Sequence, residues 1–307
     1  MPAPAAATPF GDRLAEATAR RNSPLVLGLD PDPARLWPGA AATVPIGGDP
    51  AAQAAAAVVE HCRRVIAATA EYCVAVKLQL ACFERLGPAG WRAMHDVTVL
   101  ARDHQLLVIA DGKRGDIDVT AEAYAAALFD GHPTPWGHIP GLGADAITVN
   151  PLMGADAIAP FLERARTVGG GIFVLVRTSN PGAADYEEQP LATGEPLWRR
   201  VAGDVAALDD RRGALADVGA VCGATAPERL QALRDAMPRA PFLLPGVGAQ
   251  GGTIDALAAA FAPGLAAGLV TVSRALVRAQ EQRGGTPEAA AAAAARELRD
   301  ACRRAAA

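Results

Sequence analysis

Short apolar runs alternate with longer amphipathic stretches along most of the chain. The apolar runs are rich in Val, Ile and Leu and are typical of buried strands; they cover residues 25–29, 73–79, 106–111, 146–150, 171–177, 215–222, 242–245 and 269–273. Stretches with helical spacing lie between them, at residues 51–72, 90–104, 120–129, 155–167, 197–209, 227–236 and 251–260. This alternation predicts repeated βα units around a parallel sheet.

About eight βα units in a chain of 307 residues fit a (β/α)8 barrel. We therefore predict an α/β protein in which residues 1–307 form a single TIM-barrel domain, with a short N-terminal helix at residues 10–21 and a closing helix at residues 286–306. Residues 24–277 contain no interdomain linker. An open, doubly wound sheet is the alternative, but no G-x-G-x-x-G motif follows the first predicted strand.

Composition and charge exclude several classes of partner. The chain is 51% hydrophobic and has a formal net charge of −4, so it offers no basic face for nucleic acid and no polybasic patch for a membrane. Its start lacks the charged and apolar regions of a signal peptide, and no apolar run of about 18 residues is free of Gly or charge. The 5 cysteines include no C-x-x-C pair and histidine is sparse, which predicts free cytoplasmic thiols and no metal site.

Charged side chains concentrate at the end of the third predicted strand, where Asp111, Lys113 and Asp116 follow an apolar run. Residues two apart in a strand share a face, so Asp111 and Lys113 can point into one cavity. The C-terminal ends of barrel strands carry the active site in enzymes of this architecture. The segment is therefore the leading candidate for chemistry, and a solvated, charged loop is the alternative.

Other strand ends carry polar residues that a barrel would bring to the same mouth: Asp30, Lys77, Asn150, Ser179, Gln250 and Arg274. The Gly-rich segment at residues 245–252 opens a predicted helix, and its backbone N–H groups suit an anion. Barrels often bind phosphate at the loops after strands seven and eight, where Arg274 can form a bidentate pair. We predict a phosphate site there; the alternative is a flexible loop beside a surface arginine.

The motif Asp111-x-Lys113-Arg114-x-Asp116-Ile117 resembles the signature of the orotidine 5′-phosphate decarboxylase family. The agreement covers most of the chain, because further blocks also match: LDP at residues 29–31, VKLQ at 76–79, TVNPLMG at 148–154, SNPGA at 179–183, the loop at 245–252 and SR at 273–274. The residues in these blocks are similar to those of the longer bacterial branch of the family, called type 2. The resemblance implies a (β/α)8 barrel that works as a homodimer without metal or organic cofactor and converts orotidine 5′-monophosphate to UMP and CO2 in pyrimidine biosynthesis.

The resemblance also implies catalytic roles for four residues in an alternating Lys-Asp-Lys-Asp array. Lys113 would protonate C6 of the substrate, and Asp111 would lie against the substrate carboxylate. Lys77 would pair with Asp111 and reach the ribose. Asp116, together with Thr120, would cross the dimer interface and contact the ribose in the neighbour's site.

Substrate-binding residues are implied in the same way. Asp30 would bind the ribose hydroxyls, Ser179 would bond the pyrimidine edge, and Gln250 and Arg274 would hold the phosphate. The insertion at residues 131–143 departs from the family pattern and leaves the geometry of the lid open.

Two other functions fit parts of the same pattern. A sugar-phosphate decarboxylase of the 3-keto-gulonate-phosphate type would need a Mg²⁺ site built from strand-end carboxylates, and the ammonium of Lys77 opposes a metal there. A non-catalytic phosphate-binding barrel would act as a sensor or scaffold. Binding alone does not require a lysine between two aspartates, so the four-charge array argues for an enzyme.

Overall fold

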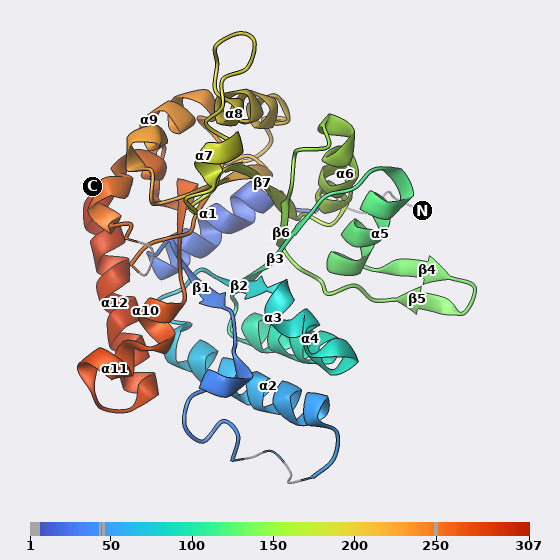
Figure 1. Cartoon of the computed structure of the whole chain (residues 1–307), viewed down its shortest axis with the longest axis vertical. Helices are drawn as coiled ribbons and strands as arrows, with labels where there is room; N and C mark the ends of the chain where they lie inside the picture. The colour runs from blue at the N-terminus through green and yellow to red at the C-terminus, as the bar shows by residue number, and fades with distance from the viewer. Residues whose placement is uncertain (1–6, 43, 45–46, 249–250) are drawn as a thin grey trace.

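The computed structural model describes residues 7–42, 44, 47–248 and 251–307. Eight parallel strands close into a barrel in the order β1-β10-β9-β8-β7-β6-β3-β2 (Figure 1). They are β1 (Leu25–Leu29), β2 (Ala75–Gln79), β3 (Leu107–Arg114), β6 (Ala146–Val149), β7 (Gly171–Arg177), β8 (Val218–Cys222), β9 (Phe242–Leu244) and β10 (Gly268–Val272). The predicted TIM barrel is confirmed, and the open sheet is excluded because β1 pairs with both β10 and β2.

Helices surround the barrel and join successive strands. The main ones are α2 (Pro50–Thr69), α4 (Gly87–Asp103), α5 (Asp118–Leu128), α6 (Ala159–Thr167), α8 (Leu197–Ala207), α9 (Pro227–Ala236) and α12 (Pro287–Ala305). Side chains cap two of them: Asp49 accepts hydrogen bonds from the first turn of α2, and Thr286 does so for α12. Helix α12 packs against α2 and completes the ring (Figure 1).

Two apolar layers hold the barrel together. The larger lies between the strands and the surrounding helices. The smaller fills the lower interior, where Phe173 on β7 meets Phe10 of α1 (Phe10–Arg21) edge to face, with 6.0 Å between ring centroids. Helix α1 therefore closes the base of the barrel, and the opposite end, where the strands finish, stays open for a site.

Three details differ from the sequence prediction. Strand β3 runs on to Arg114 instead of ending at Asp111. The insertion at residues 131–143 contains an antiparallel hairpin, β4 (His132–Thr134) with β5 (Gly137–Ile139), which extends from the barrel beside α5 (Figure 1). The helix expected over residues 251–260 is a 3-10 helix, η3 (Ile254–Phe261).

Short elements fill several of the connections. They are η1 (Pro33–Arg35), α3 (Leu80–Glu84), η2 (Ala155–Ala157), α7 (Ala183–Tyr186), η4 (Leu265–Ala267), α10 (Arg274–Val277) and α11 (Ala279–Arg283). None of the helices in the described ranges has the length and apolar character needed to cross a bilayer. All five cysteines are free thiols.

Candidate active site

An irregularity in β3 shapes the centre of the site. The register between β3 and β6 shifts between Ala110 and Arg114, and Lys113 adopts the left-handed φ of 48°. Few non-glycine residues adopt this conformation, and those that do are often held at functional positions. The shift lets Lys113 fold back so that its Nζ lies 2.6 Å from Oδ1 of Asp111.

Asp111 is the hub of the charged network. Its side chain is only 7% exposed, and its Oδ2 lies 2.5 Å from Nζ of Lys77 on β2. Burial by itself raises the pKa of this carboxyl, but the ammonium groups of Lys77 and Lys113 outweigh that effect and lower the pKa of Asp111 to about 2. Asp111 is therefore an anion at neutral pH, held between two cations.

Two further residues belong to the network although sequence reasoning did not assign them to it. The buried hydroxyl of Thr148 on β6 donates to Oδ1 of Asp111 at 2.8 Å and accepts the backbone N–H of Lys113 at 2.9 Å. Gln79 accepts a hydrogen bond from Nζ of Lys77 and donates one to the backbone oxygen of Asp111, both at 3.3 Å. The strand-end positions of these two residues are the signal that could have revealed them.

The network carries more positive than negative charge, because two ammonium groups share one carboxylate. The Lys77 side chain is 10% exposed and that of Lys113 is 44% exposed, so Lys113 presents its ammonium to solvent. These are the only two lysines in the sequence, whose other basic side chains are arginines. Both lysines therefore lie at this one carboxylate, where a compact ammonium cannot be replaced by a planar guanidinium without changing the geometry.

A cavity of about 320 Å³ at the end of the barrel, here called the mouth cavity, joins the network to other predicted residues. Lys77, Gln79, Asp30 and Arg274 line it, together with the Gly-rich segment at residues 245–247. Asp30 accepts a hydrogen bond from the hydroxyl of Ser273. The structure thus places Asp30, which is predicted to bind the ribose, and Arg274, which is predicted to bind the phosphate, in the same cavity as Lys77.

The expected phosphate end has the features of an anion site. Arg274 is exposed at the start of α10, and among the described residues it has no carboxylate within ion-pair distance. Gly246 and Gly248 have φ values of 102° and 76°, which other residues rarely adopt, so the turn depends on glycine. Gln250, the other predicted phosphate ligand, lies outside the described residues.

Among the described residues, three predicted ones belong neither to the charged network nor to the wall of the mouth cavity. The Oδ1 atom of Asp116 accepts the N–H of Ile117 at 2.9 Å, and Thr120 is exposed on the first turn of α5. Ser179 is half-buried after β7, where its backbone oxygen accepts a hydrogen bond from Thr225 at 2.9 Å. All three lie on segments that follow the strands rather than in the strands themselves.

The carboxylates around this site are not grouped as metal ligands. In the ranges that the structure describes, no three His, Cys, Asp or Glu side chains come together so as to hold a metal ion. The buried carboxylate at the centre is instead occupied by two ammonium groups and a hydroxyl.

Comparison with known proteins places the chain among its relatives. A family model described as the orotidine 5′-phosphate decarboxylase / HUMPS family matches residues 23–291. The chain belongs to this family. The orotidine 5′-phosphate decarboxylase of Haloarcula marismortui is 42% identical over 274 residues, covering 89% of this chain and 88% of its own. That of Roseiflexus castenholzii is 40% identical over 293 residues, covering 95% and 96%.

Solved structures agree with this family assignment. The structure of the OMP decarboxylase of Leishmania donovani matches with a TM-score of 0.75 and 33% identity, covering 97% of this chain and 99% of its own. A protein described as a putative orotidine 5′-phosphate decarboxylase from Streptomyces avermitilis matches with a TM-score of 0.78 and 31% identity, covering 98% and 96%. The agreement extends over nearly the whole barrel, so the mouth cavity lies within the shared fold.

Proposed function

We propose that this chain is an orotidine 5′-phosphate decarboxylase that converts orotidine 5′-monophosphate to UMP and CO2. One observation carries the proposal: at the mouth of a barrel of this family, Asp111 is clamped between Lys77 and Lys113. The relatives that are about 40% identical over most of their length bear this name. The residues of the sequence motifs support the finer proposal that the chain belongs to the longer, type 2 branch.

The reaction requires a cation at the reacting carbon. Loss of CO2 from C6 of the pyrimidine leaves a vinyl carbanion that has no neighbouring electron sink. A preorganised ammonium stabilises such a charge in a site with little water. Lys113 is the more exposed of the two lysines, and we assign to it both the stabilisation of C6 and the transfer of a proton to it.

Asp111 has two roles in this scheme. It fixes the ammonium groups of both lysines through ion pairs of 2.5 and 2.6 Å. Because its pKa is about 2, it also keeps its negative charge beside the bound substrate carboxylate. Departure of CO2 relieves that repulsion, which adds a ground-state contribution to the electrostatic one.

The remaining contacts bind the parts of the substrate that do not react. We assign the ribose hydroxyls to Asp30, the pyrimidine edge to Ser179, and the phosphate to Arg274 and Gln250. Arg274 and Asp30 line the mouth cavity with Lys77, which supports a nucleotide lying along this cavity. Binding of the distant phosphate then contributes energy that holds C6 against the ammonium of Lys113.

We further propose a homodimer in which Asp116 and Thr120 enter the neighbour's site. Apolar side chains are exposed around these residues: Ile117 is 40% exposed, Val119 77%, Leu152 70% and Met153 53%. A group of exposed apolar side chains next to a functional segment is typical of an interaction surface. The scheme uses no metal and no organic cofactor.

The direct test is the loss of orotidylate absorbance when the purified protein is added, with and without EDTA. The proposal predicts steady decarboxylation that EDTA does not change, and one UMP formed per orotidylate consumed. Activity that disappears in EDTA would favour the metal-dependent sugar-phosphate decarboxylases. No turnover by a folded protein that still binds UMP would favour the non-catalytic barrel instead.

A further inference from the structure

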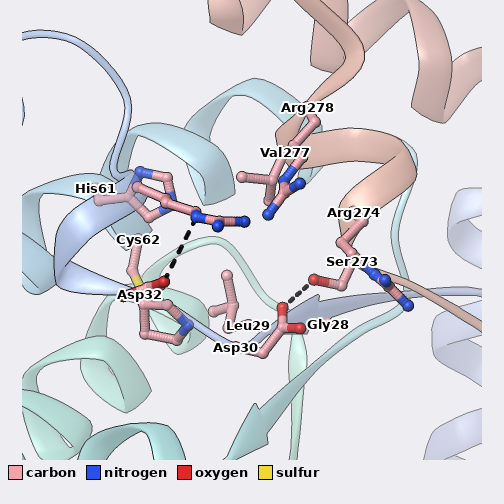
Figure 2. A pocket seen from close by; sticks show the side chains of 12 residues that line it. Gly28, Leu29, Asp30, Asp32, His61, Cys62, Ser273, Arg274, Val277 and Arg278 are labelled. Carbon is pink, nitrogen blue, oxygen red and sulfur yellow. Dashed lines mark hydrogen bonds and ion pairs between the residues drawn. The ribbon is translucent and has the colours of Figure 1, made fainter. Parts of the chain in front are cut away.

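A second cavity, here called the side cavity, lies next to the mouth cavity and has a volume of about 220 Å³. The two share a wall made of the end of β1 and the start of α10, including Asp30, Ser273 and Arg274. Beyond this wall the side cavity is lined by His61 and Arg278, which Figure 2 shows, and by Arg35, among others. The proposed reaction uses none of these three residues.

The side cavity has an excess of arginine. Arg274 and Arg278 are four residues apart, and in the described part of the chain neither has a carboxylate within ion-pair distance. Figure 2 shows Arg278 extending over the side cavity toward the side where His61 lies, whereas Arg274 points in another direction. An anion in the side cavity would give Arg278 the partner of opposite charge that it lacks among the described residues.

His61 adds an oriented, neutral donor. Its Nδ1 accepts the backbone N–H of Trp37 at 3.1 Å, so the proton of the neutral ring is on Nε2. The residue is 3% exposed, and no described residue accepts a hydrogen bond from Nε2. Burial, with a smaller effect of Arg64, lowers the pKa of His61 to about 4, which keeps the ring neutral near pH 7. The ring therefore offers one N–H from the wall of the cavity.

The two carboxylates in the side cavity already have partners. Asp30 accepts the hydroxyl of Ser273, and Oδ1 of Asp32 accepts the N–H of Ala34 at 3.2 Å. Asp32 also pairs with Arg85 at 3.6 Å and with Arg35 at 3.9 Å. On the side of the cavity away from the mouth, Arg35 therefore has a carboxylate partner. Arg278 has none among the described residues.

We propose that the side cavity binds a phosphate group, held by Arg278 and Arg35 with the Nε2–H of His61. Guanidinium groups suit phosphate oxygens because they donate paired hydrogen bonds. The group can be the second phosphate of a pyrimidine nucleoside 5′-diphosphate or free inorganic phosphate. In the first case the first phosphate is held by Arg274, so this case rests on the proposed function; the second case does not.

The shared wall gives the first case a functional consequence. A nucleoside diphosphate that reaches both cavities would occupy the mouth cavity more tightly than the monophosphate and would exclude the substrate. The side cavity would then make the enzyme sensitive to inhibition by the pool of pyrimidine diphosphates.

The test is calorimetric titration of the full-length protein with UMP, with UDP, and with inorganic phosphate in the presence of saturating UMP. Arg278→Ala is the test variant. Arg283→Ala is the control, because Arg283 is an exposed arginine nearby on α11 that pairs with Glu297 and does not line the side cavity. One of two results is expected for the wild-type protein: UDP binds roughly tenfold more tightly than UMP, or phosphate binds to the UMP complex.

In Arg278→Ala that extra binding is lost while the affinity for UMP and the rate of decarboxylation are unchanged, and Arg283→Ala behaves like wild type. Equal affinities for UMP and UDP together with no phosphate binding to the UMP complex would overturn the proposal, as would extra binding that survives in Arg278→Ala. Failure of the proposed function gives a different result, because the wild-type protein would then neither bind UMP nor act on orotidylate. In that event phosphate titration of the free protein tests whether the side cavity binds phosphate. The proposal then requires that wild type binds phosphate and that Arg278→Ala loses this binding.

Discussion

At the mouth of the barrel a buried lysine, Lys77, has a carboxylate partner, whereas at the base a buried arginine, Arg234, has backbone partners. The guanidinium of Arg234 lies 3.7 Å from the centre of the Phe242 ring. It donates to four carbonyl oxygens, those of Met237, Ala240, Ala260 and Ala267, which lie on segments that lead into β9 and β10. Arg234 therefore connects the segments that lead into these two strands. It does not line the mouth cavity, which Lys77 lines.

Buried aspartates at the two ends also have different surroundings. Asp145, just before β6, accepts the N–H of Val108 at 2.8 Å and pairs with Arg13 of α1. Burial raises the pKa of Asp217, just before β8, whereas two lysines lower that of Asp111. The charged side chains at the base connect neighbouring segments of the chain. Those at the mouth lie together beside a cavity. The neighbours of a buried charge, more than its burial, therefore distinguish a structural role from a chemical one.

The largest effect is expected when the central carboxylate is removed from the mouth. Asp111→Asn leaves Lys77 and Lys113 without their shared anion, so we expect kcat to fall by at least about 10³-fold. Asp145→Asn is the control at the base: it should lower the melting temperature and leave kcat unchanged. Steady-state kinetics and thermal unfolding of both variants measure this difference, and equal losses of kcat would remove the distinction between the two ends.

Arg234→Met tests the base directly. Loss of the guanidinium leaves four buried carbonyl groups with fewer donors, and we expect the free energy of unfolding to fall by about 3 kcal/mol. Denaturant titration gives the value. Arg200→Met, on the surface of α8 where Arg200 pairs with the nearby Asp204, should change it by less than about 0.5 kcal/mol. A folded Arg234→Met protein with reduced kcat would mean that the base contributes to the chemistry.

The low pKa of Asp111 predicts a specific acid dependence of stability. Its pKa falls from 3.8 to about 2 on folding, so its contribution is fully present above pH 3.8 and is lost as the pH falls through 2. The shift corresponds to about 2 kcal/mol. The free energy of unfolding of the wild type should therefore exceed that of Asp111→Asn by less at pH 2 than at pH 5. A difference that does not change with pH would contradict the ion-pair account.

Thr148→Val should have the smallest effect of the set. It removes the hydroxyl that joins Asp111 to the backbone of Lys113, and we expect kcat to fall by about tenfold, in line with one lost hydrogen bond to a charged group. Thr148→Ser should restore most of the rate. Thr98→Val is the matched control, since the Thr98 hydroxyl is equally buried but bonds a carbonyl of its own helix; a similar loss there would point to packing alone.

The strand pattern allowed the architecture to be predicted because a parallel barrel buries both faces of its strands. Burial of both faces gives β1 and β8 short continuous apolar runs, which are typical of strands of a parallel sheet. The hairpin β4–β5 was missed because its strands have three residues each and one contains Pro133, so they show no alternation. Its geometry depends on contacts such as that of the His138 ring with the backbone oxygen of Asp130.

Some residues of the candidate site could be predicted from the local sequence pattern, and others could not. Strand ends predicted that Asp30, Lys77 and Arg274 would surround one mouth, and the structure places them there. The bend that returns Lys113 to Asp111 depends on a left-handed residue and on Thr148 in another strand, which the local pattern does not encode. Asp116 and Thr120 could be named only from the family resemblance, because their proposed partner is a second chain.

The central claim is that the ammonium of Lys113, held by Asp111, protonates C6. The most direct measurement is the single-turnover rate of orotidylate decarboxylation by Lys113→Ala, with UMP affinity measured on the same sample. The account predicts a rate at least about 10³-fold below wild type and a UMP affinity within about tenfold of it. Near-normal turnover by Lys113→Ala would contradict the account.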